Sequence, residues 1–347
     1  MTLVWRLPGL QRLYQPLRMR VLAAQGLIAA DRNVLCGCRD GGERDGGEAV
    51  KMPFVREWPE VRRFARAGRF MAQFTGAEML LVSFRTDPKT VAAVLPRPPR
   101  PAGEPLAAAF VARYPATNFG VTYHEGALFV AAQYRGERGW YCLSMPVDND
   151  TAMIGGREQF GFPKKMAGRI TLDRDGPHVA GSVVRNGVEL LRIEGEFADP
   201  QRADVHLLGV PAADLDGRPC EKVVSFLFKY FPAADGGAFE HAPELVRQVT
   251  LVRPRPGQLT GAAKLELVSA TSDPLGEIPV RQIIAAGYGA FDNTMLPGRV
   301  VRRIYNQWRF VPKSMFKNDA FALIDPGSLP ALTFGERHDQ KKQLRAY

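Results

Sequence analysis

Two adjacent lysines, Lys164 and Lys165, lie in an otherwise apolar and aromatic part of the sequence. They follow Phe160-Gly161-Phe162-Pro163 and precede Met166-Ala167. An ammonium group in apolar surroundings loses its hydration, so its pKa falls and the neutral amine becomes available near neutral pH. A neutral amine attacks carbonyl carbon and forms a Schiff base. The segment therefore predicts carbonyl chemistry at a lysine.

A solvated surface loop is the alternative interpretation of these lysines. The chain is basic, with 46 Lys and Arg against 36 Asp and Glu and a net charge of +10. Lys341-Lys342, in a polar stretch near the C-terminus, is interpreted as such a surface pair. The neighbours of Lys164 are instead aromatic residues, proline and methionine, and these favour the reactive lysine.

The ten residues 156–165, GREQFGFPKK, resemble the active-site signature of the acetoacetate decarboxylase family. The resemblance continues on both sides in the family's order and covers roughly residues 72 to 310. The other matching segments are Phe84-Arg85-Thr86-Asp87, Tyr123-His124-Glu125, Phe228-Lys229-Tyr230-Phe231-Pro232, Glu244-Leu245-Val246, Pro274-Leu275, Ile278-Pro279-Val280 and Leu296-Pro297. A lone Lys-Lys pair has little meaning, so the ordered series carries the comparison.

By this resemblance Lys164 is the Schiff-base lysine, Lys165 is the neighbour credited with lowering its pKa, and Glu125 is the active-site glutamate. A carboxyl group in an apolar cavity suits proton transfer. An exposed turn residue before Gly126 is the alternative for Glu125. His124 would face the other way on a strand. Arg157, Glu158 and Arg85 also match the family and are interpreted as structural.

The effect of Lys165 on the pKa of Lys164 can be compared with that of burial. In an extended segment the two side chains point to opposite faces, so their ammonium groups would lie ~10 Å apart. At an effective dielectric constant of ~20 they repel by roughly 1.7 kcal/mol, or about one pKa unit. Burial contributes ~3 to 5 units. We therefore expect desolvation by Phe160, Phe162 and Met166 to outweigh Lys165.

Two positions depart from the family pattern. Ala77 stands where the family carries an arginine near the substrate carboxylate, and Phe110 stands where it carries a second glutamate. These changes remove a carboxylate anchor, add volume and add an apolar wall. We therefore expect a substrate site for a β-keto acid bulkier than acetoacetate, lined by Ala77, Phe110, Phe160, Phe162 and Met166.

The resemblance implies a lyase that forms a Schiff base with a keto acid, and decarboxylation is the first expectation. Aldol, dehydration or related imine chemistry on a keto acid is the second, because the chain lacks both polar residues. A third is a non-catalytic binder of an apolar ligand that contains a carbonyl group. No cofactor is predicted. No metal site is predicted either, because the cysteines and histidines do not cluster at ligand spacing.

Composition bounds the partners and the compartment. Basic and acidic residues are interleaved, so the positive charge does not predict nucleic-acid binding. No run approaches the ~18 to 20 apolar residues of a membrane-spanning helix. The cysteines, at positions 36, 38, 142 and 220, show no disulfide framework and fit a reducing compartment, so a cytoplasmic protein is expected. Family analogy predicts a homo-oligomer.

The predicted fold is a single α+β domain dominated by a curved antiparallel sheet, cone-like or barrel-like, with a few flanking helices. This domain is expected over residues 52–325. Residues 1–51 are an arginine-rich, partly low-complexity extension, and residues 326–347 are a polar tail. The extension is interpreted as a targeting peptide, a peripheral arm or an upstream extension, and the sequence does not choose among them.

Hydrophobic periodicity and turn signals place the individual elements. Helices are predicted between Pro88 and Pro96 and near 150–160, 218–231 and 298–309. Strands are predicted near 78–84, 106–114, 119–123, 127–134, 139–145, 166–174, 177–185, 188–197, 244–253, 262–271 and 281–292. Asn186-Gly187 predicts a two-residue hairpin turn.

Overall fold

The structure, a computed structural model, describes residues 58–66, 71–200, 208–234 and 239–319. The chain divides at Ala72 into two units. The described part of the first unit contains α2 (Trp58–Arg66), and the second unit contains the sheet and every site discussed below. No helix among the described residues is long and apolar enough to cross a membrane. The whole predicted extension and the whole predicted tail lie outside the described residues, so these domain boundaries stay predictions.

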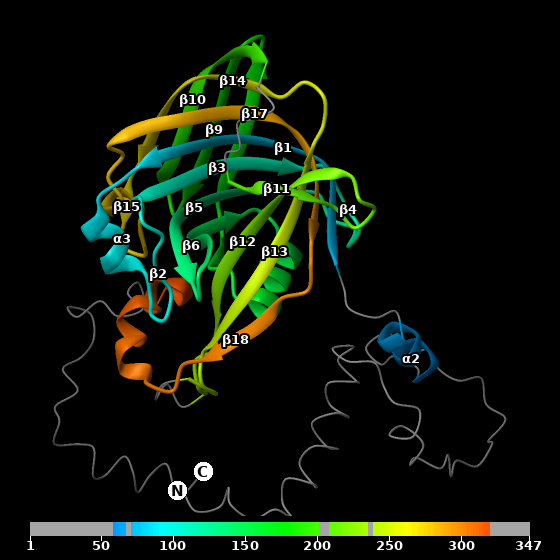
Figure 1. Cartoon of the computed structure of the whole chain (residues 1–347), viewed down its shortest axis with the longest axis vertical. Coiled ribbons are helices and arrows are strands. Elements are labelled where there is room, and N and C mark those ends of the chain that lie inside the picture. Colours follow the sequence, from blue (N-terminus) through cyan, green and yellow to red (C-terminus); the bar gives the residue numbers. More distant parts are fainter. Residues whose placement is uncertain (1–57, 67–70, 201–207, 235–238, 320–347) are drawn as a thin grey trace, which may run out of the picture. The chain divides into compact units, whose positions relative to one another are not determined.

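Seven strands close into a barrel, in which each strand pairs with the next and the last pairs with the first (Figure 1). In spatial order they are β1 (Ala72–Arg85), β3 (Leu106–Tyr114), β5 (Tyr123–Tyr134), β6 (Glu137–Val147), β12 (Pro219–Lys229), β13 (Glu244–Pro254) and β17 (Gln282–Met295). All neighbours are antiparallel except β6 and β12, which are parallel. The predicted barrel-like antiparallel fold is confirmed.

Four further strands extend the sheet beyond β17. They are β14 (Leu259–Leu267), β10 (Val188–Pro200), β9 (His178–Arg185) and β8 (Arg169–Asp175). The predicted hairpin between β9 and β10 is present, and both Asn186 and Gly187 have positive φ, 50° and 78°. Strand β9 packs closely on the barrel, because a Cβ at Gly181 would lie 2.8 Å from Val111 of β3.

Side-chain alternation sorts the buried apolar residues into two cores. Met79 and Leu81 of β1 belong to a core to which all seven barrel strands contribute, and this is the barrel interior. Leu80 and Val82 face the other way and share a second core with side chains of the four further strands, such as Val183 of β9. A residue's position along a barrel strand therefore decides whether it faces the interior.

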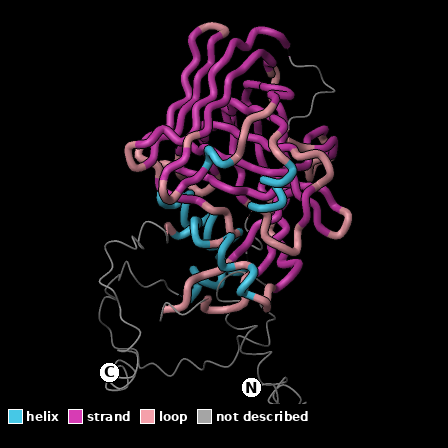
Figure 2. Tube along the Cα trace, turned by 90° about the vertical axis from the view of Figure 1, so that its left-hand side faces the viewer, coloured by secondary structure: helices cyan, strands magenta, loops and turns pink. Residues whose placement is uncertain are grey.

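The helical segments of the second unit are short (Figure 2). The predicted helix after Thr86-Asp87 is α3 (Pro88–Val94), and the one near 150–160 is α4 (Asp150–Ile154) followed by a π-helix, η2 (Gly155–Phe160). The remaining elements are short: β2 (Arg100–Pro101), β4 (Ala116–Thr117), β7 (Lys164–Met166), β11 (Val210–Ala213), β15 (Ser269–Ala270), β16 (Asp273–Pro274), β18 (Arg299–Arg303), η3 (Leu275–Glu277), η4 (Gln307–Arg309), η5 (Val311–Lys313) and η6 (Met315–Asn318).

Three secondary-structure predictions are wrong. The predicted helix over 218–231 is the barrel strand β12, and the one over 298–309 is β18 with the turn η4. Strand β12 is paired on both sides, and residues 224–228 are buried without alternation. Such a run does not distinguish a central strand from a buried helix. The strand predicted over 119–123 is a turn up to Thr122, and β5 begins at Tyr123.

Candidate active site

Lys164 and Glu125 form a buried pair. Lys164 begins β7, which lies parallel to β6 with Met145 beside Lys164. Its Nζ donates a hydrogen bond of 2.6 Å to Oε2 of Glu125, and the two side chains are only 8% and 5% exposed. Glu125 lies in β5 and not in an exposed turn, so that alternative is wrong. A lysine amine and a glutamate carboxylate thus meet in a site shielded from water.

Two tyrosines flank this pair, and the sequence analysis did not single them out. The hydroxyl of Tyr114 donates to Oε1 of Glu125 at 3.4 Å, and the ring centroid of Tyr123 lies 5.2 Å from Lys164 Nζ. Burial, reinforced by the charge of Glu125, raises the pKa of both phenols well above the usual value of 10.0. Both therefore stay protonated, and Tyr114 remains a donor to Glu125.

The π-helix η2 supports Lys164 from behind through a glycine. A Cβ at Gly156 would lie 2.6 Å from both Cδ and Cε of Lys164, so only glycine leaves room for that side chain in its present position. Gly161 ends the π-helix with a φ of 92°, in the left-handed region that favours glycine. Gly156 thus leaves room for the Lys164 side chain, and Gly161 allows the chain to leave the π-helix just before Lys164.

Lys165 points to the opposite face, as the alternation predicted. Its Nζ donates to the carbonyl oxygen of Ser272 at 2.6 Å and to Asp273 Oδ1 at 2.8 Å, and lies 2.8 Å from Asp319 Oδ1. Arg185 pairs with both of these aspartates. The positive charge of Lys165 is therefore matched by carboxylates on its own side, which supports a structural interpretation of this residue.

Four of the predicted lining residues lie in the barrel interior with the two tyrosines. They are Ala77, Phe110, Phe160 and Phe162, and all are buried. Ala112 of β3 pairs with Glu125, and Phe110 lies two residues further along the same strand. Diagonal neighbours of this kind on one face are roughly 7–8 Å apart. Phe110 is therefore part of the apolar wall of the barrel interior, close to the Lys164–Glu125 pair.

Met166 does not share this placement. It is 41% exposed and lies outside the interior core, so its predicted part in desolvating Lys164 is wrong. The physical reason is that β7 is short and at its last residue the chain returns to the surface. The ring of Tyr123 lies beside Lys164, and Phe160 and Phe162 belong to the same interior core as Tyr123.

The other residues matched by sequence contact neither the Lys164 amine nor the Glu125 carboxylate. Arg157 donates to the carbonyl oxygen of Lys164 at 3.4 Å and to Asn318 Oδ1 at 2.9 Å. Arg85 donates to Gln282 and Glu104 in exposed contacts. His124 faces away from the interior, where its Nδ1 lies 2.7 Å from Asp148 Oδ2.

The described cysteines, Cys142 and Cys220, are buried free thiols, while Cys36 and Cys38 lie outside the described residues.

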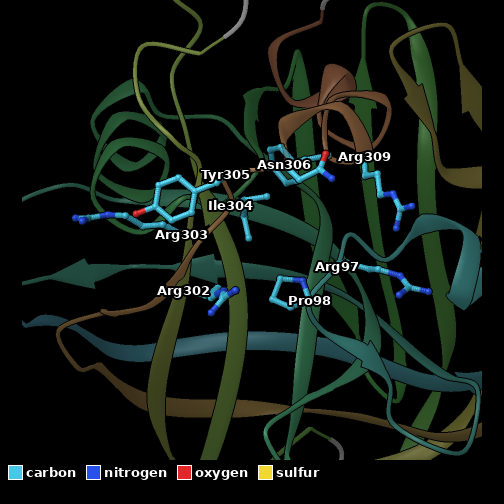
Figure 3. A pocket seen from close by; sticks show the side chains of 9 residues that line it. Arg97, Pro98, Arg302, Arg303, Ile304, Tyr305, Asn306 and Arg309 are labelled. Atoms are coloured by element: carbon cyan, nitrogen blue, oxygen red, sulfur yellow. The ribbon is translucent and has the colours of Figure 1, made fainter. Parts of the chain in front are cut away.

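A separate basic hollow of about 410 Å³ lies at the end of β18 (Figure 3). Its lining residues are Arg97, Pro98, Arg302, Arg303, Ile304, Tyr305, Asn306, Arg309 and Phe310. Arg303 is already bonded to Glu244 at 3.0 Å. Neither Lys164 nor Glu125 lines this hollow, so it is not part of the lysine site.

A closed, mainly antiparallel barrel with a buried lysine–glutamate pair inside it defines the structural class of this protein. The chain belongs to the acetoacetate decarboxylase family, because the family's sequence model matches residues 51–305. It is 31% identical over 232 residues to the acetoacetate decarboxylase of Burkholderia vietnamiensis. The aligned region covers 66% of this chain and 87% of that protein.

Solved structures share the fold. The crystal structure of acetoacetate decarboxylase from Legionella pneumophila aligns with a TM-score of 0.58 at 23% identity, over 68% of this chain and 89% of that one. The enduracididine biosynthesis enzyme MppR, complexed with the condensation product of pyruvate and imidazole 4-carboxaldehyde, aligns with a TM-score of 0.55 at 19% identity, over 67% and 89%.

Proposed function

We propose that this protein is a lyase that forms a Schiff base between Lys164 and a keto acid, and that it decarboxylates a β-keto acid bulkier than acetoacetate. The observation that carries the proposal is the 2.6 Å bond between Lys164 Nζ and Glu125 Oε2 inside an apolar barrel. Membership of a family that includes decarboxylases supports the reaction class.

Glu125 is proposed to take the proton from Lys164, so that the neutral amine attacks the substrate's carbonyl carbon. The resulting carbinolamine loses water and becomes an iminium ion. Carbon dioxide then leaves, and the electron pair of the broken C–C bond moves toward the iminium nitrogen to form an enamine. Loss of water consumes the proton that Glu125 took from Lys164, so Glu125 is a carboxylate again at the iminium stage. After it takes up a proton from solvent, Glu125 is placed to give that proton to the enamine carbon. Hydrolysis of the imine releases the ketone and the free lysine.

The preference for a bulkier substrate rests on the interior wall. Ala77 and Phe110, both buried, present only apolar surface where the family carries an arginine and a glutamate. A small hydrated anion gains little from such a wall, whereas each buried CH₂ of a longer chain contributes about 0.8 kcal/mol. An apolar site also disfavours a carboxylate relative to the products of its loss.

Aldol, dehydration or related imine chemistry is the second candidate. It uses the same Lys164 imine, and it is favoured by the absence of a guanidinium at Ala77 to hold a leaving carboxylate. The MppR structure shows only that this fold also accommodates a condensation product of pyruvate. A non-catalytic binder would form the imine and release no product, so product analysis separates the three.

Borohydride trapping with a panel of keto acids tests the proposal. We expect the adduct mass on the peptide that contains Lys164, together with release of carbon dioxide from a β-keto acid. Lys164→Ala should abolish trapping. Lys264→Ala is the matched control, because Lys264 is a surface lysine 67% exposed on β14 and should leave trapping unchanged. An adduct without carbon dioxide would support the second candidate or the binder.

The proposal extends to assembly and location. We propose a cytoplasmic homo-oligomer, by analogy with the family and from the absence of disulfide spacing in the sequence. The family-like domain is proposed to span residues 52–325, and the family match covers residues 51–305.

A further inference from the structure

Four consecutive residues near the end of the described chain, Phe316–Asp319, converge on the segment that carries Lys164. Lys317 Nζ donates to the carbonyl oxygens of Phe228 at 3.1 Å and Gly161 at 3.4 Å. Asn318 Oδ1 accepts from Arg157 at 2.9 Å. These residues lie in and just after η6, beyond residue 305 where the family match ends.

Asp319 adds a contact on the far side of Lys164. Its Oδ1 lies 2.8 Å from the Nζ of Lys165, and its Oδ2 pairs with Arg185. The ring of Phe316 has its centroid 5.8 Å from the same Lys165 nitrogen. Lys165 is therefore held by the same short segment that holds Gly161.

These contacts fall on both sides of Lys164 in the sequence. Gly161 precedes Lys164 by three residues, and Lys165 follows it directly. Arg157 donates two hydrogen bonds, one from Nη2 to Asn318 Oδ1 at 2.9 Å and one from Nη1 to the carbonyl oxygen of Lys164 at 3.4 Å. One tripeptide, Lys317 to Asp319, thus holds the segment around Lys164 at three places: the Gly161 carbonyl oxygen, the Lys164 carbonyl oxygen through Arg157, and the Lys165 side chain.

Lys317 is not a second reactive amine. It is only 4% exposed, and the ring centroid of Tyr230 lies 4.4 Å from its nitrogen. The cavity beside it, lined also by Tyr141, Cys142 and Pro163, has a volume of only about 10 Å³. That is room for about one water molecule. A keto acid does not fit there, so the ammonium group serves to tie together two carbonyl oxygens from separate elements.

We propose that Lys317, Asn318 and Asp319 form a C-terminal clamp that holds Lys164 at bonding distance from Glu125 and thereby sets the rate of imine formation. The three are positioning residues, because none of them contacts the Lys164 amine. Displacement of a reacting group by about 1 Å can lower a rate by about 100-fold. This inference rests on the proposed function of Lys164.

Asn318 offers the sharpest test, because aspartate has the same shape and keeps an oxygen acceptor. We expect Asn318→Ala to lower the rate constant of borohydride-trappable imine formation, at saturating keto acid, by about tenfold or more. Asn318→Asp should restore most of the rate. The keto acid concentration at half-saturation should change little in either variant, since the interior wall is untouched. Equal rates in the two variants and the wild type would overturn the clamp.

Asp319→Ala provides a second variant with a matched control. Asp319 is 32% exposed and pairs with arginine, and Asp87 is 38% exposed and pairs with Arg281. Asp87 contacts neither Lys164 nor its neighbours. We expect Asp319→Ala to slow imine formation and Asp87→Ala to leave it unchanged. If Asp319 only stabilised the fold, both variants would have a lower melting temperature and an unchanged rate of imine formation.

A readout without keto acid separates this inference from the proposed function. Formaldehyde with cyanoborohydride methylates accessible neutral amines, and peptide mass mapping gives the rate at Lys164 alone. Both Asn318→Ala and Asp319→Ala should change that rate by several-fold, while Asn318→Asp and Asp87→Ala should not. If no keto acid is trapped and the labelling still changes, the proposed function fails and the clamp stands. Unchanged labelling at Lys164 in both alanine variants would overturn the clamp.

Discussion

The side chain of Lys164 lies directly against the backbone of Gly156, so closely that a Cβ at Gly156 would be 2.6 Å from two of its carbons. Real Cβ atoms do not approach other heavy atoms to this distance, so a larger residue at Gly156 has to displace the lysine side chain. At the neighbouring Gly155, in the same π-helix, no heavy atom other than those of the adjacent residues and the helix's own backbone lies within 4 Å of the corresponding point.

Gly156→Ala should therefore slow imine formation, with Gly155→Ala as its control. The added methyl group moves the amine away from Glu125, and we expect a loss of about tenfold or more in the trapping rate. Both changes have the same effect on backbone freedom, so the difference between them reports the contact with Lys164. Equal trapping rates in the two variants would show that the lysine side chain adapts without consequence.

Lys165→Ala should leave trapping measurable and lower stability. The substitution removes a buried ammonium that contacts Asp273 and Asp319, but Arg185 still pairs with both carboxylates. We expect a loss of about 1 to 3 kcal/mol in the free energy of unfolding, measured by chemical denaturation. Mass mapping should still place the adduct on Lys164. An adduct on Lys165 in the wild type would reverse the assignment of the two lysines.

Glu125→Gln should slow turnover by about 10² to 10⁴-fold, because glutamine keeps the shape of the side chain but cannot accept or return a proton. Imine formation, followed by trapping, should fall much less, because Lys164 in an apolar site without its carboxylate partner can lose its proton to water. Glu78→Gln is the control, since Glu78 lies on the barrel strand β1 and pairs with Arg113 outside the interior. A wild-type turnover rate in Glu125→Gln would remove this carboxylate from the mechanism.

Acetoacetate should be a poor substrate compared with longer β-keto acids. Each added CH₂ that is buried against Phe110 should raise the specificity constant by roughly fourfold, which corresponds to about 0.8 kcal/mol. The measurement is kcat/KM for a series of β-keto acids of increasing chain length. If acetoacetate gave the highest value and each added carbon lowered it, the apolar-wall interpretation of Ala77 and Phe110 would be wrong.

Stability above neutral pH should depend on Lys317. Burial, together with the charges of Arg157 and Lys229, lowers the pKa of Lys317 from the usual value of 10.5 to about 7. Between these values the unfolded chain binds more protons than the folded protein, so stability rises with pH. The slope from this one group is at most about 1.4 kcal/mol per pH unit, and the contribution is constant below pH 7.

Lys317→Met should abolish that slope. Chemical denaturation of both proteins at several pH values between 7 and 10 checks this, and the stability of the wild type relative to the variant should increase steadily with pH. The comparison of slopes is insensitive to any constant packing cost of methionine. Parallel stability curves would mean that Lys317 titrates near the value of an ordinary lysine.

The two residues proposed to react were both predicted from the sequence. The aromatic surroundings of Lys164 and the ordered resemblance around it identified the lysine, and the same resemblance identified Glu125, which the structure places 2.6 Å away. Alternation along an extended segment also separated Lys165 from Lys164 correctly, because opposite orientation of successive side chains is a local property of a strand.

Tertiary structure alone decided what surrounds them. Asp273 and Asp319 reach Lys165 from positions 108 and 154 residues further along the chain, and no local pattern specifies such contacts. Tyr114 bonds to Glu125 only because β3 and β5 pair in one particular register. Burial of β12 on both faces removed the alternation that would have marked it as a strand. Local sequence encodes dihedral preference and side-chain periodicity, whereas strand partners and their register depend on how the whole barrel closes.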